Sequence, residues 1–112
     1  MPAKKKISAD GPTKLPTKRE MEKLRQQDDG YVLARQDLVK FLHSRRQAVY
    51  NIARTYHLEP EELLQEGYEV LLTCLRDFNP VYQKASGDIV SVQFTTFFGS
   101  RMDSRAMEMR NR

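Results

Sequence analysis

The sequence predicts an all-α protein: a compact domain of three to four helices over residues 17–112, preceded by a disordered basic tail over residues 1–16. Two helical periods, over residues 31–56 and 60–78, and a helix-start pattern at residue 94 carry this prediction. A chain of 112 residues can build one modest core. Its hydrophobic fraction of 39% is below the roughly 45–50% of ordinary globular domains, which indicates that part of the chain is not packed.

Residues 60–78 form the segment around which the rest of the chain is organised. Seven small or apolar residues recur there at three- and four-residue steps, which aligns them on one side of a helix: Leu63, Gly67, Val70, Leu71, Cys74, Leu75 and Phe78. A second stripe carries acid and amide groups: Glu62, Gln65, Glu66 and Glu69. Pro60 suits the first helical turn, and Asn79-Pro80 ends the helix. One helix therefore offers an apolar face to a core and an acidic face to something else.

Two helices are expected before this one. Thr17 and Glu20 have the spacing of a capping box, which predicts a short helix to about Gln27. Residues 31–56 are the longest helical candidate. Their polar turn at residues 44–47 either bulges into solvent or bends the helix.

The region after residue 80 is expected to begin with a loop around residues 86–88, whose flanks extend only briefly. The last helix starts near Phe94, with Thr95 or Thr96 as its N-cap. Met102, Ala106 and Met109 lie on one of its sides, and a distinct side carries Arg101, Arg105 and Arg112.

Charge is distributed in blocks. The net charge of +4 resides in residues 1–20, which hold six basic and two acidic side chains. Residues 31–57 carry five basic and one acidic side chain, residues 58–80 one and six, and residues 94–112 four and two. Such blocks indicate separate surfaces for separate partners, or mutual neutralisation between packed helices. The basic tail either attracts nucleic-acid phosphates or serves as a solubilising leader.

The sequence speaks against several function classes. No enzyme is expected, because it has no phosphate-cradling glycine loop, nucleophile–base motif or metal-ligand cluster. His43 and His57 lack partners at metal-ligand spacing, so no cofactor is expected. Cys74 is the single cysteine and lies on the apolar stripe, which indicates a buried, inert thiol. Without an apolar span or a signal core, the chain is expected to be cytoplasmic and to have no membrane partner.

Four motifs follow one another along the chain: Leu58 to Gly67 (Leu-Glu-Pro-Glu-Glu-Leu-Leu-Gln-Glu-Gly), Leu71-Leu72, Asp77-Phe78-Asn79-Pro80, and Phe94-Thr95-Thr96-Phe97. Together they resemble the second region of bacterial RNA polymerase sigma factors. The resemblance covers roughly Leu33 to Arg105 and keeps the family's order and approximate spacing. It implies a helical domain that binds the polymerase core and the −10 promoter element during transcription initiation. An anti-sigma factor is a further partner class that it suggests.

In such factors, this acidic helix face docks on the clamp helices of the polymerase largest subunit. The resemblance assigns that contact to Glu62, Gln65 and Glu66, and Glu69 lies on the same stripe. Charge-assisted pairs with an arginine-rich helix provide both register and strength. Tyr68 stands where the family has a small polar residue. A solvated surface is the alternative reading.

The last helix of the family captures single-stranded −10 DNA, using aromatic side chains against bases that have left the stack. Phe97 and Phe98 are the candidates for touching a base here, whereas Phe94 fits core packing. Thr96 and the basic residues Arg101, Arg105 and Arg110 complete the expected DNA-binding set. A solvated basic face is the alternative for the arginines.

One departure suggests an alternative or divergent sigma type. Primary sigma factors carry a tryptophan pair where this chain has Ser100-Arg101, and the chain has no tryptophan. Strong autonomous DNA melting is therefore not expected. Nothing resembles the helix-turn-helix region that reads the −35 element, so the chain is either a fragment of a longer factor or a free-standing module. A sigma mimic that occupies the polymerase without reading DNA is the alternative function.

Overall fold

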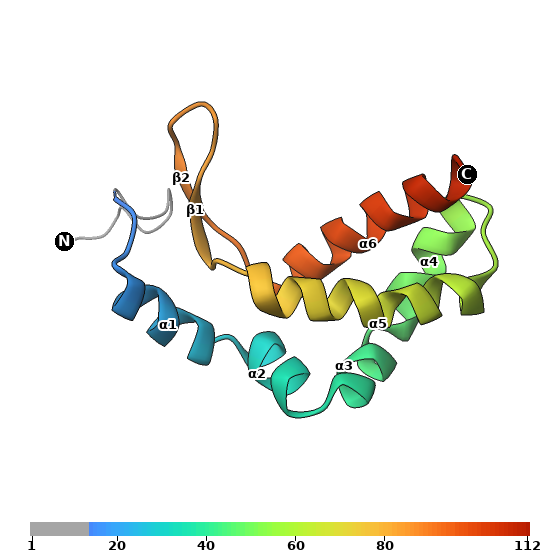
Figure 1. The fold of residues 1–112 in the computed structure, drawn as a ribbon, viewed down its shortest axis with the longest axis horizontal. Coiled ribbons are helices and arrows are strands. Elements are labelled where there is room, and N and C mark those ends of the chain that lie inside the picture. Colours follow the sequence, from blue (N-terminus) through green and yellow to red (C-terminus); the bar gives the residue numbers. More distant parts are fainter. Residues whose placement is uncertain (1–13) are drawn as a thin grey trace.

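A computed structural model describes residues 14–112 (Figure 1). Within these residues the chain forms six helices and two short strands, so the all-α prediction is confirmed. The elements are α1 Lys18–Gln26, α2 Asp29–Gln36, α3 Leu38–Ser44, α4 Arg46–Thr55, α5 Pro60–Asp77, β1 Val81–Gln83, β2 Ile89–Ser91 and α6 Phe94–Arg110. The expected basic tail, residues 1–16, falls almost wholly outside the described residues. No helix in residues 14–112 is long and apolar enough to cross a membrane.

Helix α5 lies at the centre of the fold. It runs between α6 on one side and α2 and α3 on the other, and α4 packs against both α5 and α6 (Figure 1). Its bounds agree with the prediction: Pro60 occupies the first turn and the helix ends at Asp77. The predicted apolar stripe is buried except for Leu75, which is partly buried, and Leu63, Leu71 and Cys74 are fully enclosed. Gly67 lets α3 approach closely, because a Cβ there would lie 3.2 Å from Leu42 Cδ2.

The single helix expected over residues 31–56 is instead three helices, which raises the total above the predicted three to four. The chain leaves the helical region at Asp37, whose backbone is extended and whose side chain accepts the Lys40 N–H of α3 at 3.0 Å. The second break is at Arg45, inside the polar turn where a bend was expected. His57 ends this part of the chain in the left-handed region, at φ 59°, and is exposed.

The short helix predicted after Thr17 is present as α1. Both halves of the capping box form: Thr17 Oγ1 accepts the Glu20 N–H at 3.2 Å, and the Thr17 N–H donates to Glu20 Oε1 at 2.8 Å. Helix α1 has no buried residue, so apolar burial contributes little to holding it in place. Arg25 ties it to the end of α5 by donating to the Phe78 carbonyl at 2.9 Å and to Asn79 Oδ1 at 2.8 Å.

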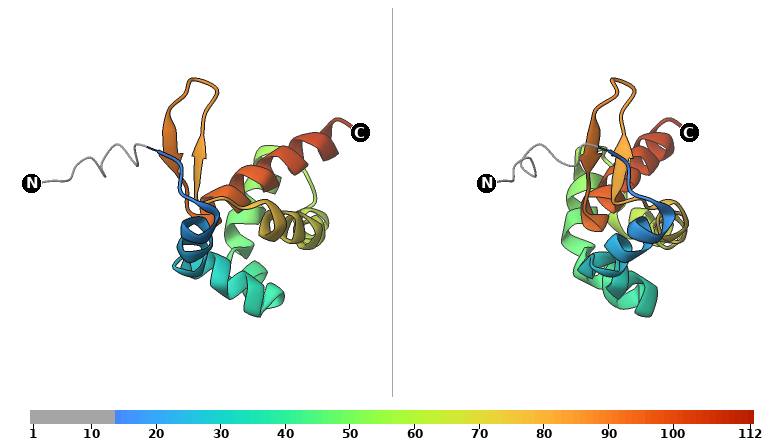
Figure 2. Two further views of the ribbon diagram at one scale, coloured as in Figure 1. Left: turned by 60° about the vertical axis from the view of Figure 1, so that its left-hand side comes forward. Right: turned by 90° about the vertical axis from the view of Figure 1, so that its left-hand side faces the viewer.

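The region expected as a loop with briefly extended flanks is a β-hairpin. Strands β1 and β2 are antiparallel, with Tyr82 opposite Val90, and Gly87 takes φ 98° in the turn. The hairpin projects away from the helices in every view (Figures 1 and 2). Only its base is well packed, through buried Val81.

An aromatic cluster forms one end of the core. Phe94, fully buried in the first turn of α6, lies at its centre. Its ring centroid is 5.6 Å from that of Tyr31, 5.4 Å from Phe41 and 5.1 Å from Phe78, all in edge-to-face arrangements. Such pairs add stability beyond their buried area. Four segments distant in sequence therefore meet at this residue.

Asp28 joins the starts of two helices. Its Oδ1 accepts the Tyr31 N–H of α2 at 3.0 Å, and its Oδ2 accepts the Phe94 N–H of α6 at 2.9 Å. The expected N-cap at Thr95 or Thr96 is wrong: the N-cap is Gln93, two residues before Thr95, and it makes no side-chain cap hydrogen bond. The first N–H groups of a helix have no partner within the helix, so a carboxylate brought from elsewhere can satisfy one of them.

We expect Asp28→Ala to destabilise the domain by about 2–3 kcal/mol, because two helix starts lose a hydrogen bond to a charged acceptor. The matched control is Asp37→Ala, which removes the single cap of α3 and should cost about 1 kcal/mol. Urea unfolding followed by circular dichroism gives both values. A loss at Asp28 no larger than that at Asp37 would contradict the double cap.

Candidate functional site

The exposed side of α5 is the first candidate surface. Opposite its buried stripe, Gln65, Tyr68 and Leu72 follow one another at steps of three and four residues, and all three are exposed. Tyr68 is 43% exposed and Leu72 56%. We call Glu62, Gln65, Tyr68 and Leu72 the outer face of α5. This face presents carboxylate, amide, aromatic and aliphatic groups on one helix, and all of these side chains are exposed.

The other two acids of the predicted stripe are already paired within the domain. Arg105 of α6 donates to Glu66 Oε1 at 2.6 Å and to Glu69 Oε1 at 2.9 Å, and lies 3.3 Å from Glu108. Its side chain is 19% exposed, and the hydrogen bond to Glu66 raises the pKa of the guanidinium. Part of the charge segregation is therefore the neutralisation between packed helices that the sequence left open. Arg105, expected to bind DNA, instead bridges α5 and α6.

We expect Arg105→Gln to lower the free energy of unfolding by about 1–2 kcal/mol, because three glutamates lose their pairing with Arg105 and only Glu66 keeps a second cation, Arg112 at 3.9 Å. Arg110→Gln, on the exposed surface of the same helix, should change it by less than about 0.5 kcal/mol. The Arg105 effect should shrink in high salt, since screening weakens partly exposed ion pairs. Equal effects of the two substitutions would show that the bridge adds no stability.

Of the two phenylalanines at the start of α6 that were candidates for touching a base, Phe98 lies in the core and Phe97 lies partly at the surface. Phe98 is 1% exposed and packs edge-to-face on Phe41 at 5.3 Å, so the prediction that it touches a base is wrong. Phe97 is partly buried, with its ring centroid 5.5 Å from Phe78. Arg101 covers Phe97, with Cζ 4.8 Å from the ring centroid. The guanidinium is exposed.

An open hollow lies between the base of the hairpin and the start of α6. Its volume is about 360 Å³, and its walls are Tyr82, Val92, Thr96, Phe97, Ser100 and Arg101. Asp77 and Asn79, at the end of α5, complete the lining. The hollow brings Thr96, Phe97 and Arg101 of the predicted DNA-binding set together. Arg110 is exposed and lies nine residues after Arg101, which is about 13 Å further along α6.

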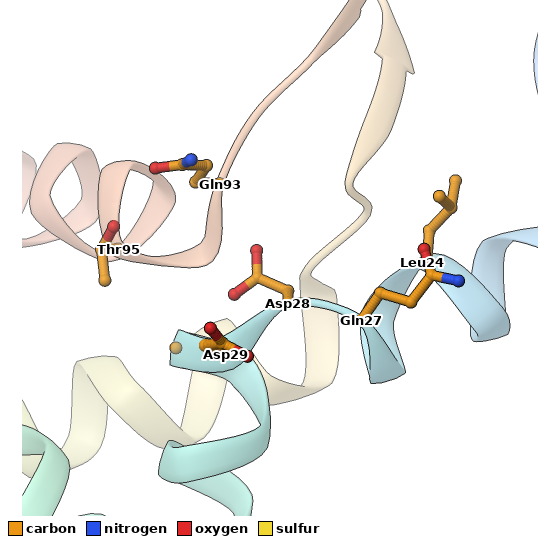
Figure 3. A pocket seen from close by; sticks show the side chains of 7 residues that line it. Leu24, Gln27, Asp28, Asp29, Gln93 and Thr95 are labelled. Atoms are coloured by element: carbon orange, nitrogen blue, oxygen red, sulfur yellow. The ribbon is translucent and has the colours of Figure 1, made fainter.

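A second hollow, of about 490 Å³, lies beside the Asp28 cap (Figure 3). Leu24, Gln27, Asp29, Gln93 and Thr95 are among its lining residues. Both Asp28 oxygens are used by helix N–H groups, so this carboxylate is part of the scaffold. Gly30 also serves packing here, because a Cβ would lie 3.1 Å from Thr95 Cγ2.

Chemistry-bearing side chains elsewhere are scattered. Within residues 14–112, no group of three His, Cys, Asp or Glu side chains is placed to hold a metal ion. Cys74 is fully buried, and burial raises the pKa of its thiol to about 11. A thiol with that pKa is protonated near neutral pH and is a poor nucleophile.

We expect Cys74 in the folded protein to resist a thiol reagent up to about pH 10 and to react at the rate of unfolding. Because the folded pKa of about 11 exceeds the ordinary value of 9.0, ionisation favours the unfolded chain and stability falls as pH rises above 9. The rate at which a thiol reagent labels Cys74, followed spectroscopically, tests this prediction, with urea-unfolded protein as the control. Immediate labelling of folded protein at neutral pH would contradict it.

Three exposed residues extend the surfaces beyond what the sequence indicated: Tyr68, Leu72 and Tyr82. The spacing of Gln65, Tyr68 and Leu72 is a helical signal, but it is visible only when the apolar stripe is placed first. Tyr82 carries no such signal in the sequence, because its place in the lining of the hollow depends on where the hairpin leaves the helices.

Comparison with known protein families, curated proteins and solved structures found no match.

Proposed function

We propose that this chain is a sigma-type transcription initiation module that docks on bacterial RNA polymerase and binds the single-stranded −10 promoter element. The outer face of α5 takes the clamp helices of the largest subunit, and the hollow at the start of α6 takes DNA. The observation that carries the proposal is the uncovered outer face of α5. Its residues lie opposite the core, so a partner helix can bind there without disturbing the fold.

The surface supports docking through a mixture of interactions. Tyr68 is of a residue type that is enriched among the residues that dominate binding energy, and exposed Leu72 adds apolar area beside it. Gln65 lies between these two residues and Glu62 on the helix. Glu62 and Gln65 offer acceptors to an arginine-rich helix. Glu66 is a poor site for testing this contact, because reversing its charge would also break its bond to Arg105. Glu69 accepts a separate hydrogen bond from Arg105, but its side chain is 73% exposed, so it can contact a partner as well.

The DNA assignment rests on fewer residues than the sequence suggested. Phe97, Thr96 and Arg101 meet at the hollow, and exposed Arg110 is left for a phosphate contact. Phe98 and Arg105 are used inside the domain. The DNA-binding set without these two residues is smaller, which favours the second candidate function, a regulator that occupies the clamp helices without reading DNA.

We expect Tyr68→Ala combined with Leu72→Ala to weaken binding to the isolated clamp helices by about 30-fold or more, because the centre of the interface loses its apolar area. Both side chains are exposed, so the fold should persist. The matched control is Val39→Ala on α3, which truncates an apolar side chain that is 61% exposed. Titration calorimetry with purified clamp helices measures the affinities.

Undiminished affinity of the Tyr68/Leu72 variant would sink the docking assignment. Adding a labelled −10 non-template oligonucleotide separates the two candidate functions. Wild-type protein that binds clamp helices and oligonucleotide is an initiation module. Binding of the clamp helices alone, with or without the oligonucleotide present, identifies the regulator.

A further inference from the structure

Three planar groups are in successive contact beside the hairpin, and the first two, the rings of Phe78 and Phe97, are tilted at 48° to each other. Phe78 is fully buried, Phe97 packs on it, and the Arg101 guanidinium covers Phe97. Burial decreases in that order, from the core to the solvent. The outermost of these three planar groups is therefore the guanidinium and not a phenyl ring.

Arg101 is free of the partners that hold the other arginines nearby. Among residues 14–112 it makes no ion pair or hydrogen bond, whereas Arg105 is held by three glutamates and Arg76 by Asp77. Its contact with Phe97, with Cζ 4.8 Å from the ring centroid, uses none of its N–H donors. A guanidinium held in this way can stack on a second flat group and still donate hydrogen bonds at its edge.

The lining of the same hollow includes a further aromatic side chain, that of Tyr82. Tyr82 of β1 is 42% exposed, and within the described residues its hydroxyl has no hydrogen-bond partner. Asn79 is held by Arg25 through its oxygen, which fixes the amide and leaves its NH₂ group available. Ser100 and Thr96 add hydroxyls. The Asp77 carboxylate also lines the hollow, which favours a neutral ligand over a phosphate beside Arg101. A flat, neutral ligand with polar edges fits this lining, and an unstacked nucleobase has that chemistry.

We propose that Arg101 and Tyr82 form a stacking site for one base of single-stranded DNA, with Arg101 acting on the base and not on a phosphate. This inference rests on the proposed function and refines it. It replaces the phenyl ring of Phe97 by the guanidinium as the surface that meets the base. The hairpin thereby becomes part of the binding site, because it brings Tyr82 to the hollow.

The two roles of Arg101 are separated by substitution with lysine. Lysine keeps the positive charge that a phosphate needs but loses the planar group that stacking needs. We expect Arg101→Lys to weaken binding of the −10 oligonucleotide by about tenfold while the salt dependence stays that of the wild type. Tyr82→Ala should give a similar loss, and Tyr82→Phe should retain most of the affinity because the ring is kept.

The matched control is Arg35→Lys. Arg35 also lies over an aromatic ring, with Cζ 5.8 Å from the Tyr31 centroid, but it does not line the hollow. Its substitution should leave oligonucleotide binding unchanged. Fluorescence anisotropy over a range of salt concentrations gives affinities and slopes, with clamp helices present in every measurement. Thermal melting checks that each variant is folded.

Oligonucleotides carrying one abasic site, moved position by position, test the contact from the DNA side. One position should weaken wild-type binding, and Arg101→Lys should add little further loss there. The stacking site is overturned if Arg101→Lys binds like the wild type while Arg101→Gln lowers the salt slope by about 0.7, the value for one phosphate contact. Wild-type protein that binds no oligonucleotide overturns the DNA part of the proposed function together with this site.

Discussion

The Asp28 carboxylate is the contact on which the arrangement of the domain depends. It accepts the Tyr31 N–H of α2 and the Phe94 N–H of α6, two groups separated by most of the described chain. Tyr31 and Phe94 also pack against each other in the aromatic cluster. One residue thus fixes where α6 begins, and the start of α6 fixes where Phe97 and Arg101 lie. Polar caps and aromatic packing act on the same two residues, so neither has to hold the helices alone.

Helix α5 then divides the molecule into an inner and an outer side. Its buried stripe contacts α3, α4 and α6, and its outer face remains uncovered. Arg105 marks the boundary between these sides by holding Glu66 and Glu69 to α6. The acidic stripe seen in the sequence is therefore two surfaces. Glu66 and Glu69 belong to an ion-pair network within the domain. Glu62 and Gln65 lie with Tyr68 and Leu72 on the outer face of α5, which is the proposed polymerase-binding surface.

Local signals in the sequence were enough for α1, α5 and the start region of α6. A capping box at Thr17, a proline at position 60 and an apolar period each act within a few residues, so they are legible in a single chain. The break at Asp37 was missed because an aspartate inside a helical period reveals a cap only when the backbone turns away. The Asp28–Phe94 and Arg105–Glu66 contacts join residues 66 and 39 positions apart, which no local pattern encodes. The same reason applies to Phe98. Phe97 and Phe98 are adjacent residues of the same type, so the sequence does not distinguish them, and only the packing of α6 against Phe41 shows that Phe98 is the buried one.

Chemical-shift mapping of the isotope-labelled domain tests most directly whether polymerase and DNA bind to separate surfaces. The account predicts that clamp helices perturb residues 62–72 on the outer face of α5, while a −10 non-template oligonucleotide perturbs Tyr82, Phe97 and Arg101 around the hollow. The two sets of shifted signals should be separate, and saturation with one ligand should leave the other free to bind. Shifts from the clamp helices that centre on the hollow, with the outer face of α5 unaffected, would contradict the account.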